Sequence, residues 1–145
     1  MNQVSLTIDS RPENVPLVGA CAKELAGDLF SAEKLSEIEQ ALTEAVNNCI
    51  EHAYCGSEEF QIIIKYVLSN DCLLIEITDQ GKQFDADYLK NLNTEFNYDP
   101  YNIDDLPEGG FGLKVIKTYM DEVDYRRENG KNYWLLKKYS SAAPN

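Results

Sequence analysis

The sequence has no long apolar run and few basic residues. No apolar stretch approaches the ~20 residues that a membrane-spanning helix needs, so we expect no membrane segment. Residues Met1 to Asp9 lack a basic stretch followed by an apolar one, which predicts no signal peptide and a cytoplasmic protein.

Thirteen Lys and Arg against 25 Asp and Glu give a net charge of −12. So acidic a surface repels nucleic-acid backbones and anionic membranes, and neither is an expected partner.

Cysteine and histidine are too scattered to form a metal-binding pattern. The four cysteines are Cys21, Cys49, Cys55 and Cys72, and His52 is the single histidine. Cys49 and Cys55 flank His52, which could suggest a metal site. Apolar packing with a separately used histidine is the favoured interpretation. In a chain without an export signal, we expect reduced thiols that mostly fill the core.

Regular apolar patterns divide the chain into strands and helices. Alternating apolar and polar residues predict a strand over 4–9. Helical spacing predicts helices over 15–30 and 32–54, the second capped by Ser31 and ended by Gly56. The remaining patterns predict strands at 60–68, 72–78, 124–128 and 132–139, with hairpin turns at 69–71 and 129–130, and helices at 87–92 and 113–120.

These elements define a fold class. The 145 residues have the length of one domain and can bury one core without disulfides or metals. We see neither an internal repeat nor a linker. The predicted architecture is a two-layer α+β sandwich, in which a mostly antiparallel sheet is covered by helices on one face.

The long predicted helix carries a polar row. Glu44, Asn48 and His52 are spaced by four residues, which keeps them on one face, apart from the apolar stripe. An amide oxygen in such a row can ligate a hydrated Mg²⁺, and the carboxylate stays free to act as a base. For this helix taken alone, a solvated polar face is the simpler interpretation.

Two further motifs contain glycine. A strand ending in Asp79 is followed by Gly81; a buried carboxylate there can accept a hydrogen bond from an exocyclic amine such as that of adenine, although ordinary turns share the pattern. Gly109, Gly110 and Gly112 precede a predicted helix, where free N–H groups could cradle phosphates. A flexible hinge is the alternative for this glycine-rich segment.

Together, the order and spacing of the three motifs resemble the GHKL superfamily of ATPases and kinases. The ExxxN box runs from Glu44 to Asn48, the DxGxxF box from Asp79 to Phe84, and the glycine box from Gly109 to Leu113. The runs LTEAVNNCIEHAY and EGGFGLKVIKTYMDEVDY are most similar to the bacterial anti-sigma factor serine/threonine kinases. The resemblance covers residues 5–138.

The resemblance implies a Bergerat-type ATP-binding sandwich over residues 1–145, with an ATP lid at about 82–112 and a tail at 140–145. Glu44 would be the general base, Asn48 the Mg²⁺ ligand and Asp79 the partner of the adenine amino group. The residues implied to bind the nucleotide are Asn48, His52, Asp79, Gly81, Phe84, Gly109, Gly110, Phe111, Gly112, Leu113 and Lys114.

The resemblance also implies a reaction and partners. Members of this family transfer the γ-phosphoryl group of ATP to a serine or threonine of an anti-anti-sigma protein. A sigma factor competes with that protein for the kinase, which is commonly a homodimer. Two alternatives stay open: an ATP-binding regulatory module with little phosphotransfer, and a detached ATP-binding half of a histidine kinase. The second is weakened because His52 lies within the first box and no phosphoacceptor histidine remains.

The predicted lid departs from the family pattern in its charge. No Lys or Arg occurs between Lys90 and Lys114, and acidic residues are frequent there. Some relatives place a cation in the lid near the γ-phosphate, and its loss can lower the rate by orders of magnitude. We hypothesise that Lys82, Lys114 or a residue of the partner substitutes for it.

Overall fold

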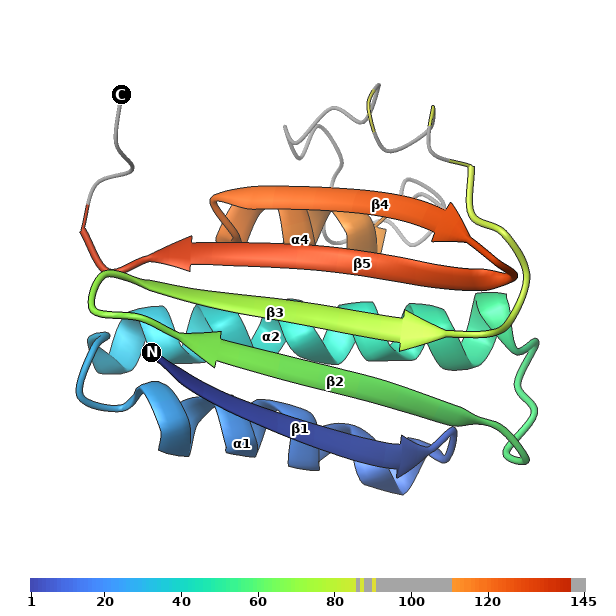
Figure 1. The fold of residues 1–145 in the computed structure, drawn as a ribbon, viewed down its shortest axis with the longest axis horizontal. Helices are drawn as coiled ribbons and strands as arrows, with labels where there is room; N and C mark the ends of the chain where they lie inside the picture. Colours follow the sequence, from blue (N-terminus) through green and yellow to red (C-terminus); the bar gives the residue numbers. More distant parts are fainter. Residues whose placement is uncertain (86, 88–89, 91–110, 142–145) are drawn as a thin grey trace, which may run out of the picture.

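The computed structural model describes residues 1–85, 87, 90 and 111–141. In this part of the chain, a five-stranded sheet forms one layer, and the helices α1, α2 and α4 cover one of its faces (Figure 1). The strand order is β1-β2-β3-β5-β4, and every pairing is antiparallel. The predicted α+β sandwich is confirmed. Its elements are β1 (Asn2–Asp9), a 3-10 turn η1 (Pro12–Asn14), α1 (Val15–Ala26), α2 (Ala32–Asn48), a π-helix η2 (Cys49–Ala53), β2 (Gln61–Leu68), β3 (Cys72–Asp79), α4 (Phe111–Tyr119), β4 (Glu122–Glu128) and β5 (Lys131–Tyr139).

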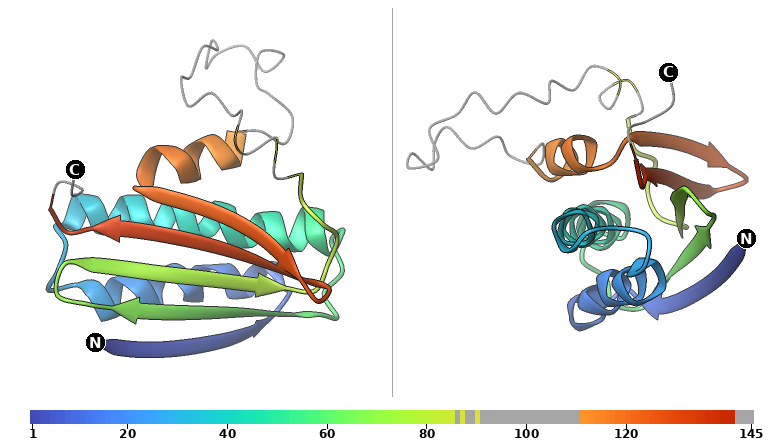
Figure 2. Two further views of the ribbon diagram at one scale, coloured as in Figure 1. Left: turned by 45° about the horizontal axis from the view of Figure 1, so that its top comes forward. Right: turned by 90° about the vertical axis from the view of Figure 1, so that its left-hand side faces the viewer.

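Helix α2 lies between α1 and α4, as the end-on view of Figure 2 shows. Its apolar stripe, with Ile38, Leu42 and Val46 fully buried, faces the sheet, so the predicted stripe is confirmed. Between α2 and the sheet lies the core, which gains stability in proportion to the apolar area removed from water. Among the described helices, none is long and apolar enough to cross a membrane.

One predicted helix end was wrong, and the second predicted helix changes type before its end. Helix α1 ends at Ala26, not at residue 30; a turn follows at Gly27, and Phe30 still reaches the core. The predicted helix over 32–54 begins as expected, with the Ser31 hydroxyl accepting from the Lys34 N–H at 3.2 Å. It stays α-helical only to Asn48.

The next five residues form the π-helix η2. Its wider turn is marked by the Tyr54 N–H, which donates to the Cys49 carbonyl five residues back. Cys55 and Gly56 then adopt positive φ angles of 54° and 82°, and the Gly56 N–H donates to the Ile50 carbonyl. Gly56 therefore ends this helical segment, as predicted.

The hairpin between β4 and β5 sets the strand register that matters for the site. Asn129 and Gly130 take φ angles of 53° and 77°, the geometry of a two-residue turn, so the predicted hairpin is confirmed. Antiparallel pairing then places Asn132 of β5 opposite Asp79 at the end of β3. The predicted helix over 87–92 lies outside the described residues, apart from Asp87 and Lys90.

Candidate functional site

A small pocket of about 160 Å³ lies where α2 passes into η2, beside the end of β3. The helical segment, the turn after β3, the start of α4 and the β4–β5 hairpin all contribute to it. Its lining combines polar groups at one end with aromatic and aliphatic side chains at the other. The lining residues are Asn48, Cys49, His52, Ala53, Asp79, Lys82, Gln83, Phe84, Leu113, Tyr125, Asn132 and Trp134.

Asp79 presents a buried hydrogen-bond acceptor in this pocket. Its side chain is 1% exposed. Oδ1 accepts from the Gly81 N–H at 2.9 Å and from Asn132 Nδ2 at 2.7 Å. Among the residues that the structure describes, no N–H or O–H group donates to Oδ2. A buried carboxylate oxygen without a donor is costly, so this atom suits a ligand that brings an N–H group.

The turn after Asp79 packs directly against the π-helix. The Lys82 N–H donates to the Ala53 carbonyl at 2.9 Å. A Cβ atom on Gly81 would lie 2.3 Å from that carbonyl oxygen, so only glycine fits there. Tyr54 also binds this turn, because its hydroxyl accepts from the Gln80 N–H at 2.8 Å. The crowding at Gly81 is thus on the side of η2, and its predicted place beside the adenine ring stays a prediction.

Three aromatic rings form one wall of the pocket. Ring centroids of Phe84 and Trp134 lie 5.0 Å apart, and those of Tyr125 and Trp134 lie 4.9 Å apart. The Phe84 N–H donates to the Tyr125 hydroxyl at 2.9 Å, which fixes the end of the DxGxxF segment on β4. Flat apolar walls with one buried acceptor suit a heteroaromatic ring that carries an amino group.

Cys49 and His52 complete the helical side of this pocket. Burial raises the pKa of the Cys49 thiol well above its usual value, and the charge of the neighbouring Asp79 carboxylate and a weak side-chain hydrogen bond between the two groups raise it further, so the thiol stays protonated. His52 is exposed and lines the same pocket. The four cysteines are free thiols; Cys49 and Cys72 are buried, and Cys55 is exposed. No group of three or more possible metal ligands occurs among the described His, Cys, Asp and Glu residues.

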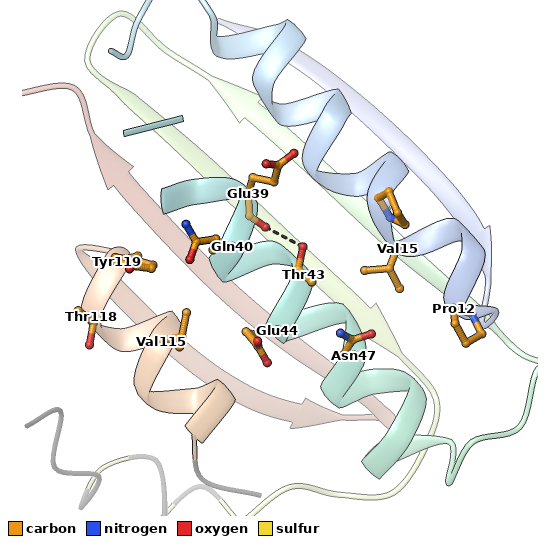
Figure 3. A pocket seen from close by; sticks show the side chains of 11 residues that line it. Pro12, Val15, Glu39, Gln40, Thr43, Glu44, Asn47, Val115, Thr118 and Tyr119 are labelled. Atoms are coloured by element: carbon orange, nitrogen blue, oxygen red, sulfur yellow. Dashed lines mark hydrogen bonds between the residues drawn. The ribbon is translucent and has the colours of Figure 1, made fainter. Parts of the chain in front are cut away.

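Glu44 lies in a second, larger hollow. This groove of about 710 Å³ is formed by α1, α2 and α4, and Figure 3 shows the side chains that line it. The Glu44 carboxylate lies against the first turn of α4, where a Cβ atom on Gly112 would come within 2.6 Å of Oε2. Partial burial raises the pKa of the Glu44 carboxyl, and the charge of Glu51 raises it further. The raised pKa makes this carboxylate a better proton acceptor than an ordinary glutamate.

The predicted site residues therefore fall into two neighbouring hollows. The pocket holds Asn48, His52, Asp79, Phe84 and Leu113, whereas Glu44 and Gly112 meet at the groove. Helix α4 begins at Phe111, not at 113, so Gly112 lies in its first turn and not in a preceding loop. Lys114 is on α4 and lines neither hollow. Gly109, Gly110 and the Phe111 side chain lie outside what the structure describes.

Six residues that line the pocket are not among the site residues that the sequence predicts: Cys49, Ala53, Gln83, Tyr125, Asn132 and Trp134. The sequence predicts only packing for Cys49, and only strands for Tyr125, Asn132 and Trp134. Only the alternation along β5 offered a signal, because Asn132 stands at an inward-facing position among apolar residues. That signal does not reveal which distant residue Asn132 meets.

Comparison with known proteins identifies the family of the chain. Residues 8–138 match the histidine kinase-like ATPase domain, and the chain belongs to this family of ATP-binding domains. It is 28% identical over 141 residues to the serine-protein kinase RsbW of Listeria monocytogenes, covering 94% of this chain and 87% of that protein. Against the protein of the same name from Staphylococcus epidermidis, identity is 36% over 108 residues, 74% of this chain and 67% of that one. The resemblance read from the sequence is confirmed.

Two solved structures share the fold. The RsbU and RsbW domains of Rv1364c from Mycobacterium tuberculosis superpose with a TM-score of 0.63 at 16% identity, over 95% of this chain and 32% of that longer chain. The catalytic domain of the histidine kinase ThkA gives a TM-score of 0.56 at 12% identity, over 97% of both chains. At these identities the likeness concerns architecture alone.

Proposed function

We propose that this protein is an ATP-dependent serine/threonine kinase of the anti-sigma-factor type. It phosphorylates an anti-anti-sigma protein and sequesters a sigma factor, acting as a homodimer in the cytoplasm. One observation carries the proposal. The pocket contains a buried acceptor atom, Asp79 Oδ2, to which no N–H or O–H group of the described residues donates, and beside this pocket lies a groove that contains the half-buried carboxylate of Glu44. The similarity to proteins named serine-protein kinase RsbW supports the choice of reaction.

The pocket is the proposed place of the adenine ring. Asp79 Oδ2 accepts from the 6-amino group, and Phe84 and Leu113 supply apolar contacts to the ring. Gly81 keeps the turn close to η2, so the pocket holds its shape. His52 and Lys114, with the backbone of Gly109 through Leu113, are proposed to bind the phosphates, because N–H groups at a helix start attract anions.

Asn48 is the proposed Mg²⁺ ligand. Asn48 is half-buried and lines the pocket, and Mg²⁺ is often bound by one or two protein oxygens together with phosphate oxygens. The described residues hold no acidic cluster that would replace this arrangement. When bound, the ion neutralises charge on the phosphates. Asn48 therefore fits a role that depends on the nucleotide being present.

Glu44 is the proposed general base. The groove beside it is open enough for a segment of a protein substrate and is lined by polar side chains of α2, including Gln40, Thr43 and Asn47. Glu44 takes the proton of the substrate hydroxyl as that oxygen bonds to the γ-phosphorus. The bond to the bridging oxygen breaks, and ADP leaves. A raised carboxyl pKa makes Glu44 a stronger base than an ordinary glutamate.

Calorimetric titration with ATP, with and without Mg²⁺, tests the site. Wild type should bind. Asp79→Asn replaces the charged acceptor, so affinity should fall by about tenfold to a hundredfold, since a hydrogen bond to a charged group contributes about 1.5–3 kcal/mol. Glu44→Ala should still bind, because the base does not hold the nucleotide. Absence of binding by the wild type would refute the ATP site.

The second candidate is a regulatory module that binds ATP with little phosphotransfer. The acidic stretch between Lys90 and Lys114, which contains no basic residue, favours it. Single-turnover transfer to a purified anti-anti-sigma protein separates the two functions. Transfer by the wild type and its loss in Glu44→Ala support the kinase; ATP binding without transfer supports the module. An unchanged rate in Lys114→Ala would exclude Lys114 as the substitute for a lid cation.

A further inference from the structure

Asn132 is the most highly connected side chain at the pocket, although no motif includes it. It is 1% exposed and begins β5, opposite Asp79. Its Nδ2 donates to Asp79 Oδ1 at 2.7 Å, to the Lys82 carbonyl at 2.8 Å and, at a longer 3.3 Å, to the Gly81 carbonyl. Its Oδ1 accepts from the Tyr125 hydroxyl and from Arg127 Nη1 at 2.8 Å.

The chemistry of these partners determines which way the Asn132 amide faces. A guanidinium can only donate, so the amide oxygen must face Arg127. A carboxylate oxygen and a peptide carbonyl can only accept, so the amide nitrogen must face Asp79 and Lys82. The Asn132 amide is thus held in one orientation, with its hydrogen-bonding groups satisfied.

This orientation makes the two oxygens of Asp79 unequal. Oδ1 receives two donors, one from Asn132 and one from the Gly81 N–H. Among the described residues, no N–H or O–H group donates to Oδ2; only the weakly donating Cys49 thiol lies beside the carboxylate, so Oδ2 is the oxygen left for a ligand. A carboxylate with both oxygens open can accept two parallel N–H bonds, whereas this one is prepared for a single donor.

We propose that Asn132 determines the base selectivity of the pocket by keeping Oδ1 of Asp79 occupied. This inference rests on the proposed nucleotide site. Adenine offers a single donor on this edge, its 6-amino group, which can bond to the open oxygen Oδ2. Its neighbouring N1 atom is an acceptor and needs no bond from Oδ1. Guanine offers two adjacent donors, N1–H and the 2-amino group, which would match an open carboxylate. Blocking the second oxygen therefore disfavours guanine without adding a contact to adenine.

The wild-type protein can be tested with three nucleotides. ATP should bind more tightly than GTP by at least about tenfold, the effect of one mismatched polar group in a buried site. Inosine triphosphate lacks the 2-amino group of GTP but keeps N1–H. GTP and inosine triphosphate should bind alike, within about twofold, because no second oxygen is open to the 2-amino group. A GTP affinity tenfold above that of inosine triphosphate would overturn the proposal.

Asn132→Ala removes one of the two donors to Oδ1 and leaves the Gly81 N–H, so Oδ1 can accept one further hydrogen bond. Arg127→Ala is the matched control. Arg127 donates to Asn132 and to the Gly81 carbonyl but not to Asp79. In Asn132→Ala, the ratio of GTP to ATP dissociation constants should fall at least about tenfold, with GTP gaining over inosine triphosphate. In Arg127→Ala, all affinities should change by one common factor, so the ratio stays as in wild type.

The titrations distinguish failure of the selectivity from failure of the nucleotide site. Equal weakening of all three nucleotides by Asn132→Ala, with the ratio unchanged, shows that Asn132 is only a brace for the turn and overturns the inference. Thermal unfolding of each variant confirms that a folded protein was titrated. A wild type that binds none of the nucleotides refutes the proposed function itself. A wild type that binds ATP and GTP equally refutes only the selectivity.

Discussion

At the scale of single residues, the two glycines near the site differ in what crowds them. A Cβ on Gly81 would meet the backbone of Ala53, at 2.3 Å from its oxygen and 2.4 Å from its carbon. For a Cβ on Gly112 the nearest atom would be Oε2 of Glu44, at 2.6 Å. The backbone of Ala53 cannot move without shifting η2, whereas the Glu44 carboxylate can rotate away. The same substitution should therefore destabilise the protein more at Gly81 than at Gly112.

Gly81→Ala should destabilise the protein by about 1–3 kcal/mol or more, the range for forced overpacking, because the turn must separate from η2. Urea-induced unfolding measures the change. Gly112→Ala is the comparison: it should change stability by no more than about 1 kcal/mol, because alanine favours helix over glycine by about that amount. An unaffected stability in Gly81→Ala would contradict the close packing of the turn.

Glu44 predicts a dependence of stability on pH. Its pKa is raised in the folded protein above the ordinary 4.5, by partial burial first and by Glu51 second. The folded state then binds the proton more readily than the unfolded chain, so stability falls as pH rises from about 4.5 through the raised value. Glu44→Gln should raise the melting temperature slightly at neutral pH and leave it unchanged in acid.

The variant Glu51→Gln supplies the control for this prediction. Without the Glu51 charge, the Glu44 pKa should fall, and the pH at which stability decreases should move toward acid. Glu33→Gln, at the exposed start of α2 and about three turns away, should leave the profile unchanged. A wild-type profile that Glu44→Gln does not alter would show that another group titrates.

At the scale of elements, two buried tyrosines join helices to the sheet. The Tyr54 hydroxyl donates to the Gln61 carbonyl at 2.7 Å and accepts from the Gln80 N–H, so it links η2 to β2 and to the turn after β3. The Tyr66 hydroxyl donates to the Val18 carbonyl at 2.7 Å and links β2 to α1, remote from the pocket. Both bonds cross between layers, but only one reaches the site.

Tyr54→Phe and Tyr66→Phe should each destabilise the protein by about 1–3 kcal/mol, because each leaves a buried polar group without its partner. Only Tyr54→Phe should also weaken ATP binding, by roughly threefold to tenfold, since Gln80 is the neighbour of Asp79. Thermal unfolding and calorimetry on both variants separate the effects. Equal ATP affinity in the two variants would show that Tyr54 contributes to stability alone.

At the scale of the whole molecule, the net charge of −12 opposes the binding of an anionic nucleotide. Free ATP carries more negative charge than its Mg²⁺ complex, so repulsion should be larger for the free form. Salt screens this long-range repulsion, since the Debye length is about 10 Å at 0.1 M and about 3 Å at 1 M. The advantage of Mg-ATP over free ATP should therefore depend on ionic strength.

Titrations at low and high salt measure that advantage. The ratio of the two affinities should fall by roughly threefold or more between 0.05 M and 0.5 M salt, and should stay above one because Asn48 still ligates the ion. In Asn48→Ala the ratio at high salt should approach one, while its dependence on salt remains. A ratio that salt does not change would mean that Mg²⁺ acts through local contacts alone.

The sequence by itself determined the elements and the family. Apolar periodicity predicted both long helices and the strands, because burial of one face repeats every 3.6 or two residues. Asn129 and Gly130 predicted their hairpin because few residues adopt positive φ easily. Motif spacing brought Asp79 and Asn48 to attention as candidate binding residues, since each motif is local to one short segment.

The tertiary structure alone decided how these residues meet. Apolar periodicity could not distinguish the π-helix η2 from an α-helix. The last carbonyl of η2, that of Ala53, is bound by the Lys82 N–H, and a contact with such a distant segment leaves no local pattern. Nor could it pair Asn132 with Asp79, 53 positions apart, since strand register follows from the packing of the whole sheet. The separation of Glu44 from the pocket likewise depends on where α4 packs on α2. Contacts between distant segments leave no local pattern, and the candidate site is built from such contacts.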